Sequence, residues 1–305
     1  MDYILLILGF IALVKGADLF VDGSSSIAKI LKVPSVIIGL TIVALGTSLP
    51  EASVSILAGL SGNNDMAISN VLGSNAFNSL VVVGLCSAIV PFATNPSILK
   101  RDFLVNISVS ILLFIFILDY KLSSLEGIIF LIILFSYMFF MIKEARSSKI
   151  EVDETKAMSL PKSLIYVVVG VAVIILGGNL VVSSASNIAT AFGLSQTLIG
   201  LTIVAIGTSL PELVTSLVAV HKKDSGLALG NAIGSNILNI VFILGASSAL
   251  SAMTVTFESI IDCAFIVGVS IMMYIFGRTN KEFSRTEGII CVSIYVLYTI
   301  YLIMR

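Results

Sequence analysis

The sequence predicts an all-α membrane protein of ten transmembrane helices, arranged as two inverted five-helix repeats with discontinuous helices at a central polar site. Three observations lead to this fold class. The composition is 57% hydrophobic and only 11% charged, whereas about a quarter of the residues in a soluble domain are charged. Apolar runs recur along the whole chain, and a block of polar residues inside the second run is repeated inside the seventh.

The apolar runs are continuous, which favours helices over the alternating pattern of an outer-membrane barrel. A helix needs about 20 apolar residues to cross a bilayer, so the lipid bilayer is an expected partner. A net charge of −1 gives no indication of nucleic-acid binding. The ten expected spans cover residues 3–28, 35–60, 66–93, 102–118, 125–142, 163–190, 196–220, 226–252, 258–277 and 287–304.

Basic residues indicate how the chain is oriented. Loops that follow odd-numbered spans hold 14 of the 17 Lys and Arg residues. Because cytoplasmic loops carry the excess of basic residues, we expect these loops inside and both termini extracellular. The first apolar run has no basic leader and is too long for a cleaved signal peptide, so we expect it to be a true span. The expected location is the plasma membrane, with multiple passes.

The chain contains an internal duplication. Shifting the sequence by 161 residues aligns 16–80 with 177–241 without a gap, and 27 of the 65 aligned positions are identical. Each half holds five spans, an odd number, so the second half enters the membrane from the opposite side. Inverted repeats are typical of secondary transporters, whose substrate binds at mid-membrane between the halves. We expect a first repeat at 1–146, a cytoplasmic linker at 147–161 and a second repeat at 162–305.

The most similar stretch of the two repeats is ALGTSLPE at 44–51 and AIGTSLPE at 205–212. Pro50 has no N–H and its ring clashes with the carbonyl of Gly46, so we expect the helix to open at Gly46 and Thr47. Freed carbonyls are tolerated inside a bilayer only where protein, water or an ion satisfies them. The motif therefore predicts a broken helix that lines a polar cavity.

Oxygen-bearing residues of the second and third spans fall on single helix faces, and the same columns recur in the seventh and eighth spans. We expect a pseudo-two-fold axis to bring the four columns together. For the serines and asparagines, hydrogen bonding between helices is the competing interpretation. The columns are Ala44, Thr47, Ser48, Glu51 and Ser55; Asn70, Ser74 and Asn78; Ala205, Thr208, Ser209, Glu212 and Ser216; and Asn231, Ser235 and Asn239.

This set of donors favours a hard metal cation. It contains no His or Cys, and a site with six or more oxygens suits calcium better than magnesium. Glu51 and Glu212 would balance one divalent ion, whereas an uncompensated charge at the bilayer centre costs at least about 2.5 kcal/mol. When calcium leaves, sodium ions or protons have to replace it. The lone His221 is in a loop and no nucleophile is paired with a base, so we expect a transporter without cofactors and not an enzyme.

Three further residues lie near the inner end of the first span. Lys15 precedes Asp18 by three residues, and Asp22 follows one turn later. We expect an internal ion pair there, because side chains three or four residues apart share one face of a helix. Gly234, beside the second column of the second half, is expected to permit close helix packing, as is its counterpart Gly73.

GTSLPE with GSNAFN in the first half, and GTSLPE with GSNILN in the second, resemble the alpha repeats of the cation/calcium antiporter superfamily, sodium/calcium exchanger branch. The resemblance covers the whole layout and implies that spans two, three, seven and eight form the ion core, while the long first and sixth spans slide. It implies that calcium is bound by Glu51 and Glu212 and the carbonyls of Thr47 and Thr208. The implied sodium sets are the Ala44 carbonyl, Ser48, Ser74 and Glu51, and the Ala205 carbonyl, Ser209, Ser235 and Glu212, with Asn78 and Asn239 bordering the pocket.

The expected function is calcium export driven by sodium entry, with about three sodium ions per calcium, in a protein that works as a monomer. Asn239 stands where some relatives carry an aspartate, which disfavours potassium co-transport and removes a carboxyl that could hold a proton. The proton/calcium branch typically has a GNAAE-like stretch where GTSLPE stands here. A proton/calcium antiporter and a sodium-coupled exchanger of another divalent cation remain alternatives. A cation channel is disfavoured because nothing resembles a four-fold filter.

Overall fold

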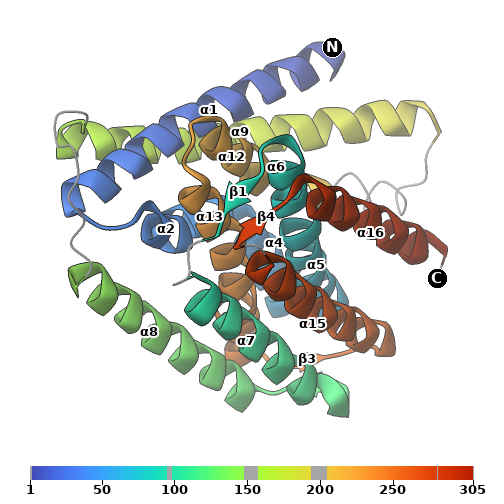
Figure 1. Cartoon of the computed structure of the whole chain (residues 1–305). Coiled ribbons are helices and arrows are strands. Elements are labelled where there is room, and N and C mark those ends of the chain that lie inside the picture. Colours follow the sequence, from blue (N-terminus) through green and yellow to red (C-terminus); the bar gives the residue numbers. More distant parts are fainter. Residues whose placement is uncertain (1, 95–97, 148–156, 194–204, 280, 305) are drawn as a thin grey trace.

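The computed structural model describes residues 2–94, 98–147, 157–193, 205–279 and 281–304. These residues are mostly helical, with four strands of two residues each, so the all-α prediction is confirmed (Figure 1). The first half contains α1 (Asp2–Leu31), α2 (Ser35–Ile38), η1 (Gly39–Val43), α3 (Ala44–Thr47), α4 (Leu49–Leu60), α5 (Asn64–Phe77), η2 (Asn78–Val82), α6 (Val83–Ile89), β1 (Phe92–Ala93), η3 (Ile98–Asp102), α7 (Phe103–Phe116), η4 (Ile117–Asp119), β2 (Lys121–Leu122) and α8 (Ser124–Ser147).

The second half contains α9 (Leu160–Ala191), α11 (Ala205–Thr208), α12 (Leu210–His221), α13 (Ser225–Leu238), η7 (Asn239–Leu244), α14 (Gly245–Leu250), β3 (Met253–Thr254), α15 (Phe257–Arg278), β4 (Glu282–Phe283) and α16 (Arg285–Met304). The elements η1, η2, η3 and η7 are π-helical turns, whereas η4 is a short 3₁₀-helix. Single π-turns inside helices are rare and frequently lie at functional sites.

Eight helices in the described part are long and apolar enough to cross a membrane, and they coincide with eight of the predicted spans. Ser35–Thr47 and Leu49–Leu60 form a pair bent by 54° where the second span was expected, which gives a ninth if it is counted as one span. The chain is thus a multi-pass membrane protein. The predicted seventh span, 196–220, lies partly outside the described residues, so the count of ten stays a prediction.

The break in the second span lies one residue later than predicted. Ser48, with φ −83° and ψ 8°, separates α3 from α4, and Pro50 falls in the first turn of α4. Ser209 has the same role before α12, with φ −93° and ψ 5°. A proline is tolerated in the first turn of a helix, where its missing N–H would have no partner. Pro50 therefore begins a new helix after the break instead of opening a continuous one at Gly46.

The two longest helices, α1 and α9, have 30 and 32 residues and pack side by side (Figure 1). They are antiparallel, because Gly9 meets Gly177 whereas Gly16 meets Gly170. A Cβ added at Gly170 would lie 2.7 Å from the backbone N of Phe20. Small residues let membrane helices approach closely where no aqueous hydrophobic effect drives them together.

The interior of the molecule is formed by α5 with η2 and α13 with η7, which are the most buried of the candidate spans. α13 crosses α2 and η1 closely: a Cβ added at Gly39 would lie 2.5 Å from the carbonyl oxygen of Leu227. One added at Gly234 would lie 2.8 Å from Cα of Leu40, so the packing role expected for this glycine is confirmed. A Cβ added at Gly73 would meet no described atom within 4 Å, so the packing role expected for Gly73 stays a prediction.

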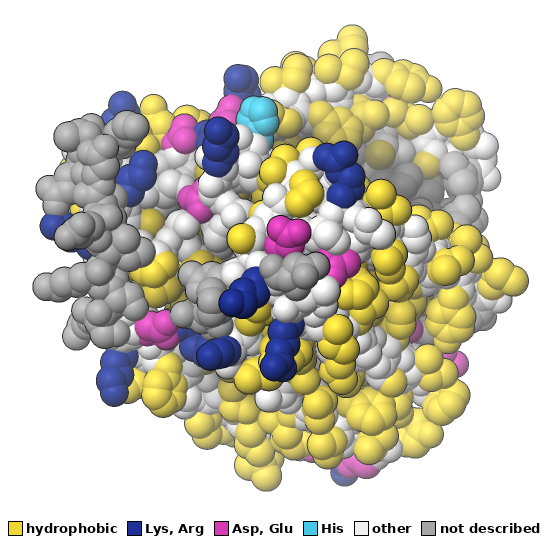
Figure 2. Space-filling model, viewed as in Figure 1, with side chains coloured by type: hydrophobic (Ala, Val, Ile, Leu, Met, Phe, Trp, Pro, Cys, Tyr) yellow, Lys and Arg dark blue, Asp and Glu magenta, His cyan; other side chains and the backbone are white. Residues whose placement is uncertain are grey.

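Two small antiparallel sheets connect the halves. β1 pairs with β4, and β2 pairs with β3. Each pair joins a loop of the first half to a loop of the second. On the face shown in Figure 2, hydrophobic side chains dominate the right and lower parts, while Lys and Arg side chains lie over the left, upper and central parts. A protein that faces lipid needs an apolar surface along its helices, with its Lys and Arg side chains confined to limited areas.

Candidate functional site

Two buried carboxylates lie at the centre of the molecule. Glu51 is the third residue of α4 and Glu212 the third residue of α12, each just after a helix break. Their exposed fractions are 1% and 0%. The first turn of a helix favours a negative charge, because the unpaired backbone N–H groups point towards it. The breaks at Ser48 and Ser209 thus create the helix ends that favour these two carboxylates.

Each carboxylate is hydrogen-bonded by a serine of the opposite half. Ser48 Oγ donates to Glu212 Oε1 at 3.0 Å and lies 3.0 Å from Ser235 Oγ. Ser209 Oγ donates to Glu51 Oε1 at 3.1 Å and lies 3.1 Å from Ser74 Oγ. The serine and the glutamate of each GTSLPE motif therefore lie in two matching hydrogen-bonded clusters, Ser48 with Glu212 and Ser235, and Ser209 with Glu51 and Ser74.

Several oxygens of this centre carry no hydrogen bond from the described residues. They include the second carboxylate oxygens, Oε2 of Glu51 and Oε2 of Glu212. The amide of Asn78 and Oδ1 of Asn239 also have none, although both side chains are fully buried. Buried polar atoms are almost always paired, so such a group of acceptors needs a ligand, water or ion. These oxygens fit a desolvated cation.

Threonine and asparagine side chains hold the halves together beside the carboxylates. Thr47 Oγ1 contacts Asn231 Oδ1 at 3.0 Å, and Asn231 Nδ2 contacts Ser216 Oγ at 3.0 Å. The counterpart contacts are from Thr208 Oγ1 to Asn70 Oδ1 at 3.5 Å and from Asn70 Nδ2 to Ser55 at 2.9 Å. Asn70 and Asn231 therefore form hydrogen bonds between helices in the structure.

A second polar layer follows at the π-turns. Asn239 Nδ2 donates to Asn75 Oδ1 at 3.0 Å, and Asn75 Nδ2 donates to the carbonyl of Asn236 at 3.2 Å. Asn236 Nδ2 reaches Ser79 Oγ at 2.8 Å. The turns η2 and η7 begin at Asn78 and at Asn239. Ser79 was missed by the sequence reasoning because its counterpart in the repeat is Ile240, so the duplication gave no signal for it.

The two predicted alanine ligands differ in what the structure says of them. Ala44 is buried, and its carbonyl accepts from Ser48 N at 3.0 Å and faces Thr47 Oγ1 at 3.4 Å. Ala205 is the first residue of α11, and its side chain lies outside the described part. The predicted sodium sets group Ser48 with Glu51, whereas the hydrogen bonds join Ser48 to Glu212.

The ion pair expected near the inner end of the first span exists, but its partner is Lys222 and not Lys15. Lys222 Nζ lies 3.1 Å from Asp18 Oδ1 and 2.8 Å from Asp22 Oδ1. The neighbouring Asp224 caps α13 and accepts from Ser25 and Ser35 at 2.8 and 2.6 Å. Sequence spacing favoured Lys15 because it lies on the same helix, but the fold brings the loop after α12 against α1.

The donor set has a clear chemical character. Among the residues that the structure describes, no three His, Cys, Asp or Glu side chains come together as a metal cluster. The oxygens gathered at the centre belong to two carboxylates and to the hydroxyl and amide side chains around them. Such ligands suit calcium and sodium better than zinc or copper, which prefer nitrogen and sulfur.

Comparison with known proteins agrees with this chemistry. The family described as "Sodium/calcium exchanger protein" matches residues 1–143 and 162–304. The chain is 37% identical over 308 residues to the "Putative antiporter CaxA" of Alkalimonas amylolytica, covering 97% of this chain and 96% of that protein. It is 33% identical over 344 residues to "Sodium/calcium exchanger MaX1" of Methanosarcina acetivorans, covering 99% and 98%. A solved structure of the sodium-calcium exchanger NCX_Mj matches with a TM-score of 0.87 at 33% identity, covering 97% of both chains.

Proposed function

The chain belongs to the sodium/calcium exchanger family, and we propose that it exchanges sodium for calcium across the membrane by alternating access. The family consists of membrane exchangers and not enzymes, which excludes a catalytic interpretation of the buried glutamates. The observation that carries the proposal is the pair Glu51 and Glu212. Both are fully buried, both keep one oxygen without a partner among the described residues, and each is bonded by a serine of the other half.

Calcium binds between the two carboxylates in this proposal. Two negative charges balance one divalent cation, so the occupied centre has no net charge inside the membrane. This balance limits the free-energy cost of burying the ion and the two carboxylates. The carbonyls of Thr47 and Thr208 complete the calcium ligands. Their support is positional, because each threonine lies directly before the break that begins the glutamate's helix.

Sodium ions replace calcium at overlapping ligands. The sodium sets are the Ala44 carbonyl, Ser48, Ser74 and Glu51, and the Ala205 carbonyl, Ser209, Ser235 and Glu212, with Asn78 and Asn239 beside them. The hydrogen bonds of the structure run between the two sets, from Ser48 to Ser235 and from Ser209 to Ser74, and the support for the proposal is that all four hydroxyls lie within reach of the two glutamates or of each other. Because both sets use the glutamates that hold calcium, the two kinds of cation exclude each other. Mutual exclusion is the physical basis of antiport, and we propose about three sodium ions per calcium.

The membrane arrangement is part of the same proposal. Ten spans form two inverted repeats, residues 1–146 and 162–305, joined by a cytoplasmic linker at 147–161. The duplicated motif supports this, as does the match of the family in two blocks on either side of the linker. The concentration of Lys and Arg in alternate loops supports extracellular termini and a plasma-membrane location. We propose that one chain is sufficient, because the glutamates and their serines come from a single chain.

The related proteins support sodium as the counter-ion. MaX1 is named a sodium/calcium exchanger, and the NCX_Mj structures are described in terms of extracellular ion exchange and binding-site occlusion. In this chain, Asn239 donates to Asn75 and offers an amide, not a titratable carboxyl, at the π-turn. A proton carrier at that position is therefore absent.

The proposal is tested by calcium uptake in proteoliposomes under sodium, potassium and pH gradients imposed one at a time. Outward sodium gradients should drive calcium uptake, whereas potassium and pH gradients without sodium should not. Uptake that follows a pH gradient in the absence of sodium would replace the proposal by a proton/calcium antiporter. A calcium conductance that persists without any counter-ion would indicate a channel.

A further inference from the structure

A groove lined by neither Glu51 nor Glu212 runs between α7 and α8. The two helices pack mainly on other elements, α7 on α15 and α8 on α14 and η7. Two open cavities of about 400 and 780 Å³ lie along the groove, and Arg101, Val105 and Ile133 line both of them. Because they share these side chains, the cavities form one continuous surface feature.

Most of the groove is apolar and faces the region where lipid chains lie. Leu104 and Leu112 line one cavity, and Phe140 lines the other. Leu104 is 44% exposed and Phe140 is 60% exposed. Both helices are candidate membrane spans, so these side chains face hydrocarbon and not water. A hydrocarbon chain would therefore fit the apolar part of this groove.

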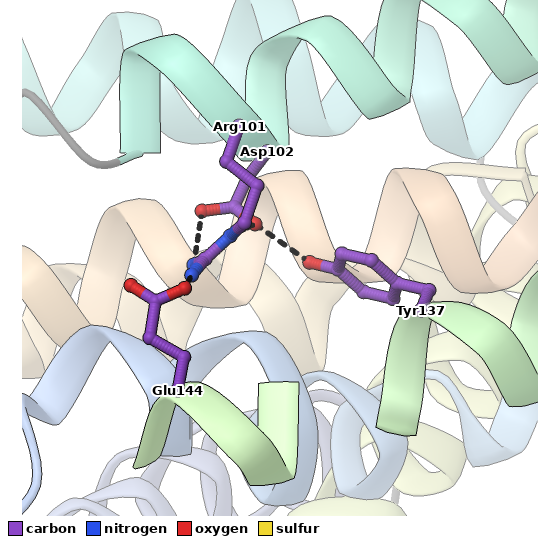
Figure 3. A network of polar contacts seen from close by, with 4 residues as sticks. All are labelled: Arg101, Asp102, Tyr137 and Glu144. Carbon is purple, nitrogen blue, oxygen red and sulfur yellow. Dashed lines mark hydrogen bonds and ion pairs between the residues drawn. The ribbon is translucent and has the colours of Figure 1, made fainter. Parts of the chain in front are cut away.

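One end of the groove is basic. Lys100 lines the first cavity, Lys143 the second, and both are exposed. Arg101, which lines both cavities, is held by two acidic side chains (Figure 3): Nε and Nη2 each donate to the Asp102 carboxylate at 2.7 Å, and Nη1 donates to Glu144.

Tyr137 completes this network by donating from its hydroxyl to Asp102 Oδ1 at 3.0 Å. Asp102 is fully buried, whereas the Arg101 side chain is 22% exposed. Within the described part of the chain, the two acids use three of the five N–H bonds of the guanidinium, so two of them have no described acceptor. The three basic and two acidic side chains leave one net positive charge at this end, and the two lysines carry charges that the network does not neutralise.

We propose that this groove binds an anionic glycerophospholipid, with an acyl chain along Leu104, Val105 and Ile133 and the phosphate at Lys100, Lys143 and Arg101. Basic pockets between transmembrane helices are suited to anionic head groups. The charge bias of the loops places this end on the cytoplasmic side, so the lipid comes from the inner leaflet. The site is separate from the exchange centre and does not depend on which cations are exchanged.

The absence of tryptophan from the chain allows a direct test. Leu104→Trp places a single indole in the groove, and Leu112→Trp places one further along it, in case the first substitution blocks entry. Leu297→Trp, at a 66% exposed position on α16, serves as the reporter outside the groove. Each variant is reconstituted in phosphatidylcholine bilayers that contain increasing fractions of brominated phosphatidylglycerol, whose bromine atoms quench nearby indoles.

We expect half-maximal quenching in the groove at a phosphatidylglycerol fraction about tenfold lower than at position 297, because each basic residue attracts an anionic lipid. Adding Lys100→Gln and Lys143→Gln should remove this preference. The control pair Lys29→Gln and Lys223→Gln removes equal charge outside the groove and should preserve it. Identical quenching curves for both groove reporters and for Leu297→Trp would overturn the proposal. A preference that survives loss of Lys100 and Lys143 would also overturn it.

Discussion

The centre of the molecule and the α1–α9 pair are held together in different ways. At the centre, Ser48 and Ser209 bond glutamates of the opposite half, and Thr47 contacts Asn231 across the same boundary. Between α1 and α9, the described contacts are mainly glycine against backbone and apolar side chains, with polar contacts from Ser163 to Ser26 and, at an exposed end, from Asn187 to Asp2. Directional bonds fix the first region, whereas shape alone fixes most of the second.

The two kinds of contact suit the two regions to different roles. Hydrogen bonds require particular donor and acceptor positions, so the centre is suited to holding ligand oxygens in place. Close apolar packing between helices depends on volume and not on polar partners. Substitutions at the centre should therefore change which cations bind, whereas substitutions in the α1–α9 contact should change folding stability first.

The largest effect is expected at the glutamates. Replacing Glu51 or Glu212 by Gln removes half of the charge that balances a divalent cation. Loss of one partner of a buried charge pair costs about 3–5 kcal/mol, which lowers calcium affinity by at least about a hundredfold. Sodium-dependent calcium flux in proteoliposomes should vanish. Glu258→Gln, in the exposed first turn of α15, is the matched control and should transport normally; near-normal flux in both Glu51→Gln and Glu212→Gln would contradict the assignment.

The second-largest effect is expected on folding stability, at the glycine contact between α1 and α9. Gly170→Ala inserts a methyl group 2.7 Å from the backbone N of Phe20, where a backbone atom cannot move aside cheaply. Overpacking of this kind costs about 1–3 kcal/mol, and less monodisperse protein should remain after heating in detergent. Gly268→Ala meets no described atom within 4 Å and should be neutral or stabilising. Equal behaviour of the two variants would show that α1 and α9 are not tightly packed.

A smaller and more selective effect is expected at Ser48. Ser48→Ala removes the hydroxyl between Glu212 and Ser235 but no charge. A hydrogen bond to a charged group contributes about 1.5–3 kcal/mol, so the half-saturating sodium concentration should rise roughly tenfold or more while calcium binding changes less. Ser53→Ala, at an exposed position of α4, is the control. If calcium affinity falls as far as sodium affinity, Ser48 is not specific to the sodium set.

The smallest effect is expected at the inner end of α1. The Lys222 side chain is 27% exposed, and those of Asp18 and Asp22 are 42% and 51% exposed. Pairs this accessible contribute about 0–1 kcal/mol, so Lys222→Gln should leave flux and thermal stability close to those of Lys223→Gln. A loss as large as that of Gly170→Ala would mean that this ion pair, and not glycine packing, holds α1 in place.

Much of the polar centre could be predicted from the sequence, because its residues occur in both repeats. The serines and glutamates of both GTSLPE motifs, together with Ser74 and Ser235, lie where helical spacing placed them, around two carboxylates. The hydrogen bond from Ser48 to Glu212 could not be predicted, because it depends on how the two halves meet and not on spacing within either half. The π-turns at Asn78 and Asn239 add a residue inside uniformly apolar runs, where periodicity gives no signal.

Two local predictions in the first half were wrong. The partner of Asp18 and Asp22 is Lys222, 200 or more residues away along the chain, and local spacing favoured Lys15 instead. The break before α4 was expected at Gly46 and Thr47 because proline was treated as an interruption. Ser48 is the residue that leaves the helix, and Pro50 lies in the first turn of the next one.

Competition between calcium and sodium for the purified protein shows whether the two cations share the buried glutamates. Radioactive calcium bound to the protein in detergent is measured while sodium is raised at constant ionic strength. Sodium should displace calcium with a dependence steeper than that of a single site, because several sodium ions share the two glutamates. The double variant Glu51→Gln with Glu212→Gln should bind no calcium. Calcium binding that is insensitive to sodium, or that persists in the double variant, would contradict shared binding at the glutamates.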